Sequence, residues 1–173
     1  GIRIRDGDDF PYLESRGFDD AFLKSERLLC AQNEKGEPLL DSMGNPVLEC
    51  MCGAILEGRF DASKPHFTSR GSFWTNSTTE MLASTPPGDQ PPRARNLCII
   101  GGFMSMALVP LRTDDRIIGL LQLNDRREGC FTEERVHFFE ELTAGIGVAV
   151  EREQAQRTHR DLEAQLRQSQ KME

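Results

Sequence analysis

The pattern of apolar and polar positions is clearest in residues 107–125, where it predicts a β-hairpin. Two apolar runs, residues 107–111 and 117–123, flank a short turn that is rich in aspartate. Apolar runs of this length between turn residues are typical of strands, and a short connection joins such strands antiparallel. Further extended segments are predicted at residues 2–5, 10–15, 67–68 and 72–75. Antiparallel strands therefore form the centre of the predicted domain.

Helix signals precede, interrupt and follow these strands. Asp19 or Asp20 can cap a helix that runs to about Cys30, and residues 78–83 predict a short capped helix. A very long helix is predicted from Thr132, an N-cap residue followed by two glutamates that the helix dipole favours. Its core-facing stripe is predicted to comprise Val136, Phe139, Leu142, Ile146, Val148 and Ala149.

Three segments between these elements have distinct compositions. Residues 33–46 are rich in glycine and proline and predict turns or a small hairpin insertion, whereas residues 47–56 are apolar enough to be buried. Residues 84–96 contain four prolines, so no regular element is expected there. We expect this proline-rich segment to be a surface loop that borders or covers a site.

The hairpin, followed by Phe131-Thr132-Glu133-Glu134 and a terminal helix, resembles the C-terminal half of a GAF domain. The resemblance implies an α/β (α+β) fold: a central antiparallel sheet of five or six strands, flanking helices and a long C-terminal helix. It also implies a sensor of a small ligand, a metal or a redox state that regulates an output domain in the same polypeptide. A full GAF domain normally has a helix before its first strand, so residues 1–150 are predicted to be a GAF sensor domain without that helix.

Residues 151–173 are polar, rich in glutamine and arginine, and free of glycine and proline. A weak heptad seam places Val148, Ala155, Leu162 and Ser169 at d positions, with Arg152, His159 and Leu166 at a positions. One interpretation is a signalling helix that pairs with a second copy to form a homodimer, and the alternative is a solvated tail that frays. Residues 166–173 resemble the run that leads into the dimerisation helix of sensor histidine kinases. This resemblance implies an ATP-dependent two-component kinase as the parent protein.

The net charge and the hydropathy of the chain argue against two classes of partner, nucleic acid and membranes. The net charge of −7 disfavours nucleic acid and anionic membranes, because phosphate groups would be repelled. No apolar run approaches the roughly 20 residues that a membrane span needs, and there is no secretory signal. We therefore expect a cytoplasmic segment that makes no membrane contact.

The five cysteines are the strongest chemical signal, and in a reducing compartment they are expected to be thiols or metal ligands. In an extended or looped backbone Cys50 and Cys52 would point the same way and could chelate one metal ion, whereas in a helix they would diverge by about 200°. Cys30 and Cys98 could complete a four-thiolate zinc or iron–sulfur centre. The alternatives are a redox-active thiol pair and small buried hydrophobic side chains. Cys130 is expected to take no part.

A second resemblance concerns the segments around these cysteines. Leu48-Glu49-Cys50-Met51-Cys52-Gly53, together with residues 71–79 and 95–98, resembles a subgroup of bacterial GAF domains attached to histidine kinases. It implies that the cysteines lie near one another on one side of the sheet. GAF ligands usually sit between the sheet and the segments that cover it, so by position seven residues are candidates to bind an unknown small ligand: Phe73, Trp74, Thr78, Thr79, Arg95, Phe103 and Ser105. Trp74 could equally fill the core, and Arg95 could be solvated.

An enzymatic alternative rests on Cys52 and Cys98, which loosely resemble the cysteines of the GAF-fold free-methionine-sulfoxide reductases. That chemistry needs an attacking thiolate of low pKa and a resolving thiol. The acidic pocket residues of that family are not matched, because Cys98 is followed by Ile-Ile-Gly-Gly. We therefore expect no catalytic activity in this segment.

Overall fold

The hairpin formed by β4 (Ser105–Thr113) and β5 (Arg116–Asp125) lies at the centre of the sheet. The computed structural model describes residues 1–91, 93–113 and 116–170, so the aspartate pair predicted for the hairpin turn lies outside the described residues. The other strands are β1 (Ile2–Ile4), β2 (Tyr12–Glu14) and β3 (Phe73–Thr75). All five pair antiparallel in the order β2-β1-β5-β4-β3. The predicted fold class is confirmed.

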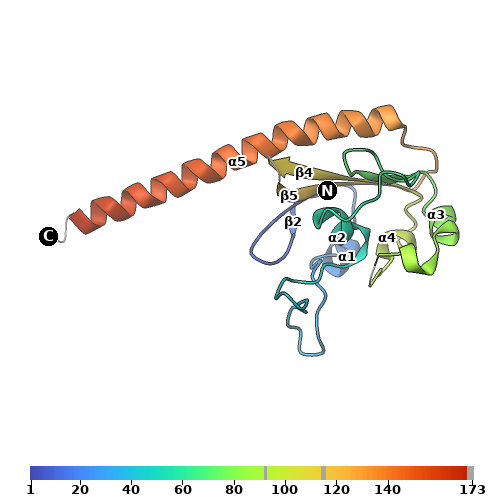
Figure 1. The fold of residues 1–173 in the computed structure, drawn as a ribbon, viewed down its shortest axis with the longest axis horizontal. Helices are drawn as coiled ribbons and strands as arrows, with labels where there is room; N and C mark the ends of the chain where they lie inside the picture. The colour runs from blue at the N-terminus through green and yellow to red at the C-terminus, as the bar shows by residue number, and fades with distance from the viewer. Residues whose placement is uncertain (92, 114–115, 171–173) are drawn as a thin grey trace.

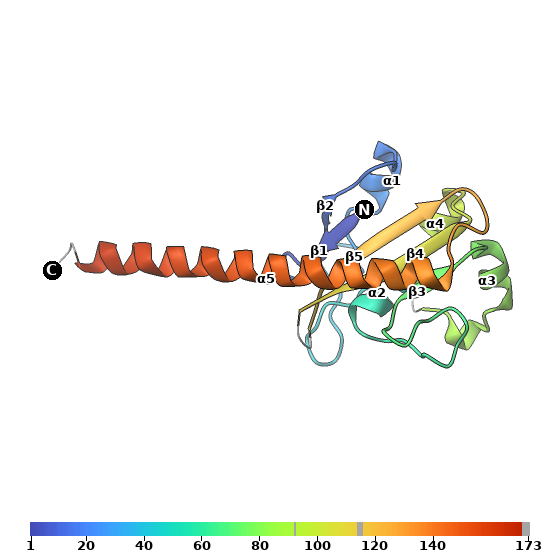
Figure 2. The same ribbon diagram turned by 90° about the horizontal axis from the view of Figure 1, so that it is seen from above.

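The short helices and the long helix cover opposite faces of this sheet (Figures 1 and 2). One face carries α1 (Asp20–Ser25), α2 (Cys50–Leu56), α3 (Thr78–Ser84) and α4 (Leu97–Ile100). The other face carries α5 (Glu133–Gln170), which packs on β4 and then runs well beyond the sheet. Its 38 residues give a length of about 57 Å.

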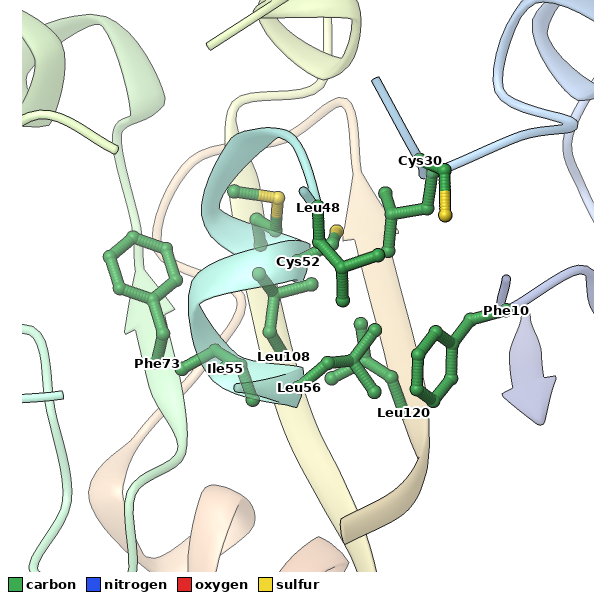
Figure 3. Packing of buried hydrophobic residues seen from close by; sticks show 11 residues of the cluster. Phe10, Cys30, Leu48, Cys52, Ile55, Leu56, Phe73, Leu108 and Leu120 are labelled. Carbon is green, nitrogen blue, oxygen red and sulfur yellow. The ribbon is translucent and has the colours of Figure 1, made fainter. Parts of the chain in front are cut away.

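The alternation of side chains along β3 and β4 divides the core into two layers. Phe73 and Leu108 pack with α2 in the larger cluster, which Figure 3 shows. The neighbouring Ala107 belongs instead to the smaller cluster with Phe131 and with Val136 of α5, and Trp74 packs against that cluster. Adjacent residues of β3 therefore face different layers of the molecule.

Helix α5 begins as predicted, because the Thr132 hydroxyl accepts a hydrogen bond from the Arg135 amide at 3.3 Å. The predicted inward stripe is only partly right. The residues of α5 buried against the sheet are Val136, Glu140, Thr143 and Gly147. Of the predicted stripe, Phe139 and Ile146 are half-buried, whereas Leu142, Val148 and Ala149 are exposed. Residues spaced three and four positions apart lie on one face of a helix. On the buried face of α5, two of these residues, Glu140 and Thr143, are polar.

Smaller differences concern loops and helix ends. The helix expected to reach Cys30 ends at Ser25, and Cys30 instead forms an isolated bridge with Leu48. The proline-rich segment contains one short 3-10 helix, η1 (Pro87–Asp89), and α4 was not predicted. Residues 33–46 form a hairpin insertion of two consecutive tight turns, which the bridges Gln32–Pro38 and Leu40–Pro46 close. No helix among the described residues has the length and apolar character required to traverse a bilayer.

Candidate functional site

A cleft of about 760 Å³ lies on the face of the sheet that carries the short helices. Its walls come from α2, β3 and α3 and from two loops, residues 59–67 and residues 84–91. The apolar lining side chains are Met51, Ala54, Phe60, Pro65, Phe67, Phe73, Met81, Pro86 and Pro91. The volume and the apolar lining are those of a small-molecule site. The proline-rich segment borders this cleft, and that the cleft binds a ligand stays a prediction.

The two loops meet across the mouth of the cleft through an ion pair. Lys64 Nζ lies 2.9 Å from Asp89 Oδ1, and both side chains are partly exposed. Such exposed pairs contribute about 0.2–1 kcal/mol. The contact therefore links the two loops only weakly.

Of the seven residues predicted to bind a ligand, Phe73 lines the cleft. Trp74 packs on the α5 side of the sheet and borders an adjoining hollow with His66. Thr79 is exposed, and its hydroxyl lies 3.3 Å from that of Ser77.

Three more of these residues have structural contacts. The buried Thr78 hydroxyl donates to the Phe103 carbonyl at 2.7 Å, and the Phe103 ring packs edge-on against Phe18 and Phe22. The buried Ser105 hydroxyl donates to the Arg127 carbonyl at 2.7 Å. These contacts join β4 to the segments on either side of it.

Arg95 is part of a largely buried charge network. Its guanidinium lies 3.4 Å from Glu26 and 3.0 Å from Glu49, and Glu26 also pairs with the fully buried Arg3 at 3.3 Å. Arg95 further donates to the carbonyls of Ser25 and Leu28. Removing one partner of such a network leaves an uncompensated buried charge. The network fixes the end of the proline-rich segment to α1 and α2.

The backbone at Cys50 and Cys52 is helical, which is the alternative in which the two side chains were expected to diverge. Both residues lie in α2, and Cys50 starts this helix with a φ of +62°. The Cys50 sulfur accepts a hydrogen bond from the Arg95 amide at 3.0 Å, whereas Cys52 is buried in the core that Figure 3 shows. Their side chains therefore leave the helix in different directions. The apolar run 47–56 fits a buried helix as well as a strand.

The predicted four-thiolate centre is not assembled either. The Cys30 thiol donates to the Asp8 carbonyl at 2.9 Å, and the Cys98 sulfur accepts from the Gln122 amide at 3.5 Å. Within residues 1–91, 93–113 and 116–170, no group of three or more His, Cys, Asp or Glu side chains is placed to hold a metal ion.

Burial also changes the acidity of three thiols. It raises the pKa of Cys98 and of Cys30 to about 12, and that of Cys52 well above its ordinary value. These thiols stay protonated at neutral pH and are poor nucleophiles. Cys52 and Cys98 therefore lack the acidic thiolate that a sulfoxide reductase would need.

A second polar cluster, which was not predicted from the sequence, joins the cleft wall to α5. The buried Glu140 carboxylate accepts hydrogen bonds from the hydroxyls of Thr68 at 2.5 Å and Ser72 at 2.6 Å. His137 Nδ1 lies 2.9 Å from its other oxygen, and Arg70 Nε lies 4.0 Å away. The segment that ends in this cluster begins with the 59–67 loop of the cleft.

Comparison with known proteins assigns the family. The family model described as "GAF domain" matches residues 26–151, and the chain therefore belongs to the GAF domain family, whose members are regulatory domains. A crystal structure of similar fold comes from a protein described as a two-component sensor histidine kinase of Sinorhizobium meliloti 1021. The similarity covers 92% of this chain and 82% of that one, with a TM-score of 0.55 and 12% identity. No curated protein matches the chain.

Proposed function

We propose that this chain is the sensor domain of a cytoplasmic two-component histidine kinase, and that a small ligand in the cleft controls the kinase through α5. Membership of the GAF family and the likeness in fold to a domain from a sensor kinase protein support this role. In this proposal residues 1–150 receive the signal, and residues 151–173 begin the connection to an ATP-dependent kinase domain in the same polypeptide. The segment itself catalyses no reaction.

One observation carries the proposal: the continuous segment of residues 59–72 forms a wall of the cleft at one end and binds α5 at the other. Phe60 lines the cleft and also a hollow of about 390 Å³ that Glu140 borders under α5. A few residues further on, Thr68 and Ser72 bind Glu140. A ligand that displaces the 59–67 loop would therefore change the hydrogen bonds that position α5.

The energy of this contact is large enough for a switch. Hydrogen bonds to a charged group contribute about 1.5–3 kcal/mol, and more is lost when a buried partner is left unpaired. Coupling energies between the sites of allosteric proteins are typically about 1–3 kcal/mol. A change in the Glu140 contacts would therefore suffice to alter the balance between two positions of α5.

The test compares Glu140→Gln with Glu141→Gln in the full-length kinase that contains this chain. Glutamine keeps the size of Glu140 but weakens its charged hydrogen bonds, whereas the neighbouring Glu141 is exposed. We expect Glu140→Gln to change the basal rate of autophosphorylation severalfold and Glu141→Gln to leave it unchanged. Hydrogen exchange of residues 133–147 would report whether α5 loosens. A looser α5 with an unchanged autophosphorylation rate would contradict the relay.

We further propose that a second copy of the chain is the partner of α5. Its side away from the sheet presents Phe138, Leu142 and Val148, of which 57%, 45% and 65% is exposed. Leu162, with 55% exposed, continues the apolar series. Leu166 and Ser169 of the predicted seam lie in α5, but their side chains are not among those that the structure describes. A helix that leaves the globular body needs a partner to be stable in water, which favours a parallel pair over a fraying tail.

A further inference from the structure

The floor of the cleft consists of aromatic rings and thioethers. The ring centroids of Phe67 and Phe73 lie 5.5 Å apart at an interplanar angle of 65°, and those of Phe60 and Phe67 lie 6.5 Å apart. Met51 and Met81 line the same space. Flexible thioethers adapt to a flat ligand and pack favourably on its ring. Such a floor favours a planar aromatic molecule over a sugar or a small ion.

The charged side chains of the described lining already have partners within the protein. Arg59 Nε donates to Glu57 at 2.6 Å, and Lys64 pairs with Asp89 at 2.9 Å. The Asp61 carboxylate accepts from the amide and hydroxyl of Ser63. An ionised ligand would lose its water without gaining an unpaired opposite charge, and that loss is costly.

The uncharged polar side chains of the lining are also hydrogen-bonded, to backbone carbonyls of residues 81–90. The hydroxyls of Ser84 and Thr85 both donate to the Met81 carbonyl, at 3.1 Å and 2.7 Å. The Gln90 amide donates to the Thr85 carbonyl at 3.3 Å. A ligand rich in hydroxyl groups would have to compete for these atoms, whereas an aromatic ring would not.

His66 offers one polar position beside the aromatic floor. Its ring centroid lies 6.1 Å from that of Phe73, and the side chain lines both the cleft and the adjoining hollow. An imidazole can donate or accept one hydrogen bond at the edge of a ligand ring. A single hydroxyl or carbonyl substituent on the ligand would fit there.

We propose that the ligand of this cleft is an uncharged aromatic molecule with at most one polar substituent, which packs on Phe67 and Phe73 and meets His66 at its edge. The inference rests on the proposed function, which places a ligand in the cleft. It excludes nucleotides, amino acids and inorganic anions, because each of these carries a charge that the described lining does not balance.

The test uses two fluorescent probes with the same aromatic skeleton. N-phenyl-1-naphthylamine is uncharged, and 1-anilinonaphthalene-8-sulfonate carries one negative charge. We expect the uncharged probe to bind with one-to-one stoichiometry and at least tenfold more tightly than the sulfonate. Titration of the purified chain, with probe emission as the readout, would measure both affinities.

Two substitutions would locate the probe, and one serves as a control. Met81→Trp fills the cleft, and Gly88→Leu adds a side chain at its mouth, where a Cβ meets no atom within 4 Å. Each should weaken binding of the uncharged probe at least tenfold. Met43→Trp makes the same change at a side chain that is 81% exposed on the hairpin of residues 33–46, and it should have no effect. Since Gly88→Leu fills open space, it keeps the test valid if Met81→Trp fails to fold.

The outcomes separate this inference from the proposed function. Equal or tighter binding of the sulfonate would overturn the uncharged class and leave the cleft as the ligand site. Binding of the uncharged probe that neither cleft variant weakens would overturn both the class and the site. The relay through Glu140 has its own test in the rate of autophosphorylation.

Discussion

His137 shows how a single side chain can make the contact between α5 and the loop before β3 depend on pH. Its Nδ1 lies 2.9 Å from Glu140 and its Nε2 lies 3.6 Å from Glu133, while Arg70 approaches Glu140 from the loop. The hydrogen bond with Glu140 is the main cause that raises the pKa of His137 above its ordinary value. The protonated imidazole is therefore favoured in the folded state.

This shift predicts a pH-dependent contribution to stability. A pKa that is raised on folding stabilises the protein below the ordinary histidine pKa, and this stabilisation is lost as pH rises through the folded-state value. His137→Gln should therefore lower the free energy of unfolding more at pH ~5.5 than at pH ~8.5. Urea denaturation at both values measures the difference. His159→Gln, on the part of α5 beyond the sheet, is the control, and an equal loss at both pH values for His137→Gln would contradict the prediction.

At the residue scale, the sequence predicted helix N-caps better than contacts between residues far apart in the chain. Thr132 caps α5 and Asp19 caps α1 through its carboxylate, because a cap depends on the few residues that follow it. The position of Cys50 and Cys52 depended instead on whether residues 47–56 were a strand or a helix. Cys30 and Cys98 are placed by segments far apart along the chain, and no local pattern states where such segments meet.

At the element scale, α5 contacts the end of β4 through a glycine. A Cβ built on Gly147 would lie 2.0 Å from the Arg112 carbonyl oxygen, whereas one on Gly145 would meet no atom within 4 Å. The closest atom at Gly147 belongs to the backbone, so no side-chain rotation can relieve the clash. Gly147 thus sets how closely the helix approaches the sheet.

The pair Gly147→Ala and Gly145→Ala therefore tests this contact with identical chemical changes. Alanine in a helix interior is favoured over glycine by about 1 kcal/mol, so Gly145→Ala should be neutral or stabilising. Gly147→Ala should lower the free energy of unfolding by about 1–3 kcal/mol, because the helix must move away from the sheet. Chemical denaturation of both variants measures the effect. Equal stabilisation by the two alanines would show that α5 does not lie this close to β4.

The buried face of α5 could not be predicted from the pattern of apolar residues along this helix alone. Helix α5 carries apolar residues on two sides, and the sequence did not distinguish the side that packs on the sheet. Leu142 and Val148 were expected inside, whereas Glu140 and Thr143 are buried. The hydroxyls of Thr68 and Ser72 make a glutamate acceptable there, and they come from a distant segment.

At the scale of the whole molecule, the architecture was predictable because it depends on a few strong local signals. The hairpin of β4 and β5 and the capped helix that follows it were enough to indicate the GAF family, which the comparison confirms. The cleft was not predictable in the same way. Its lining combines loop residues 59–67 with α2 and α3, and of this lining the sequence indicated only Phe73 and the proline-rich segment.

The proposed pairing of two copies through α5 gives a prediction at this scale. Leu142→Glu would place a charge in the apolar series of α5, so it should shift the purified chain from dimer toward monomer. Leu40→Glu changes a leucine of comparable exposure on the hairpin of residues 33–46 and should leave the dimer intact. Light scattering coupled to size-exclusion chromatography measures the mass of each variant. A wild-type chain that stays monomeric at high concentration would contradict the pairing.

Adjacent residues of β3 face opposite layers of the core, and this arrangement has a consequence for the fluorescence of the protein. Phe73 faces the cleft, while Trp74, the single tryptophan of the chain, packs against the cluster of Ala107, Phe131 and Val136 that lies between the sheet and α5. The indole emission of the unlabelled protein therefore originates at the junction between the sheet and the outgoing helix. Its wavelength and quenching would change with a displacement of α5, so tryptophan fluorescence would report the helix movement that the proposed relay requires.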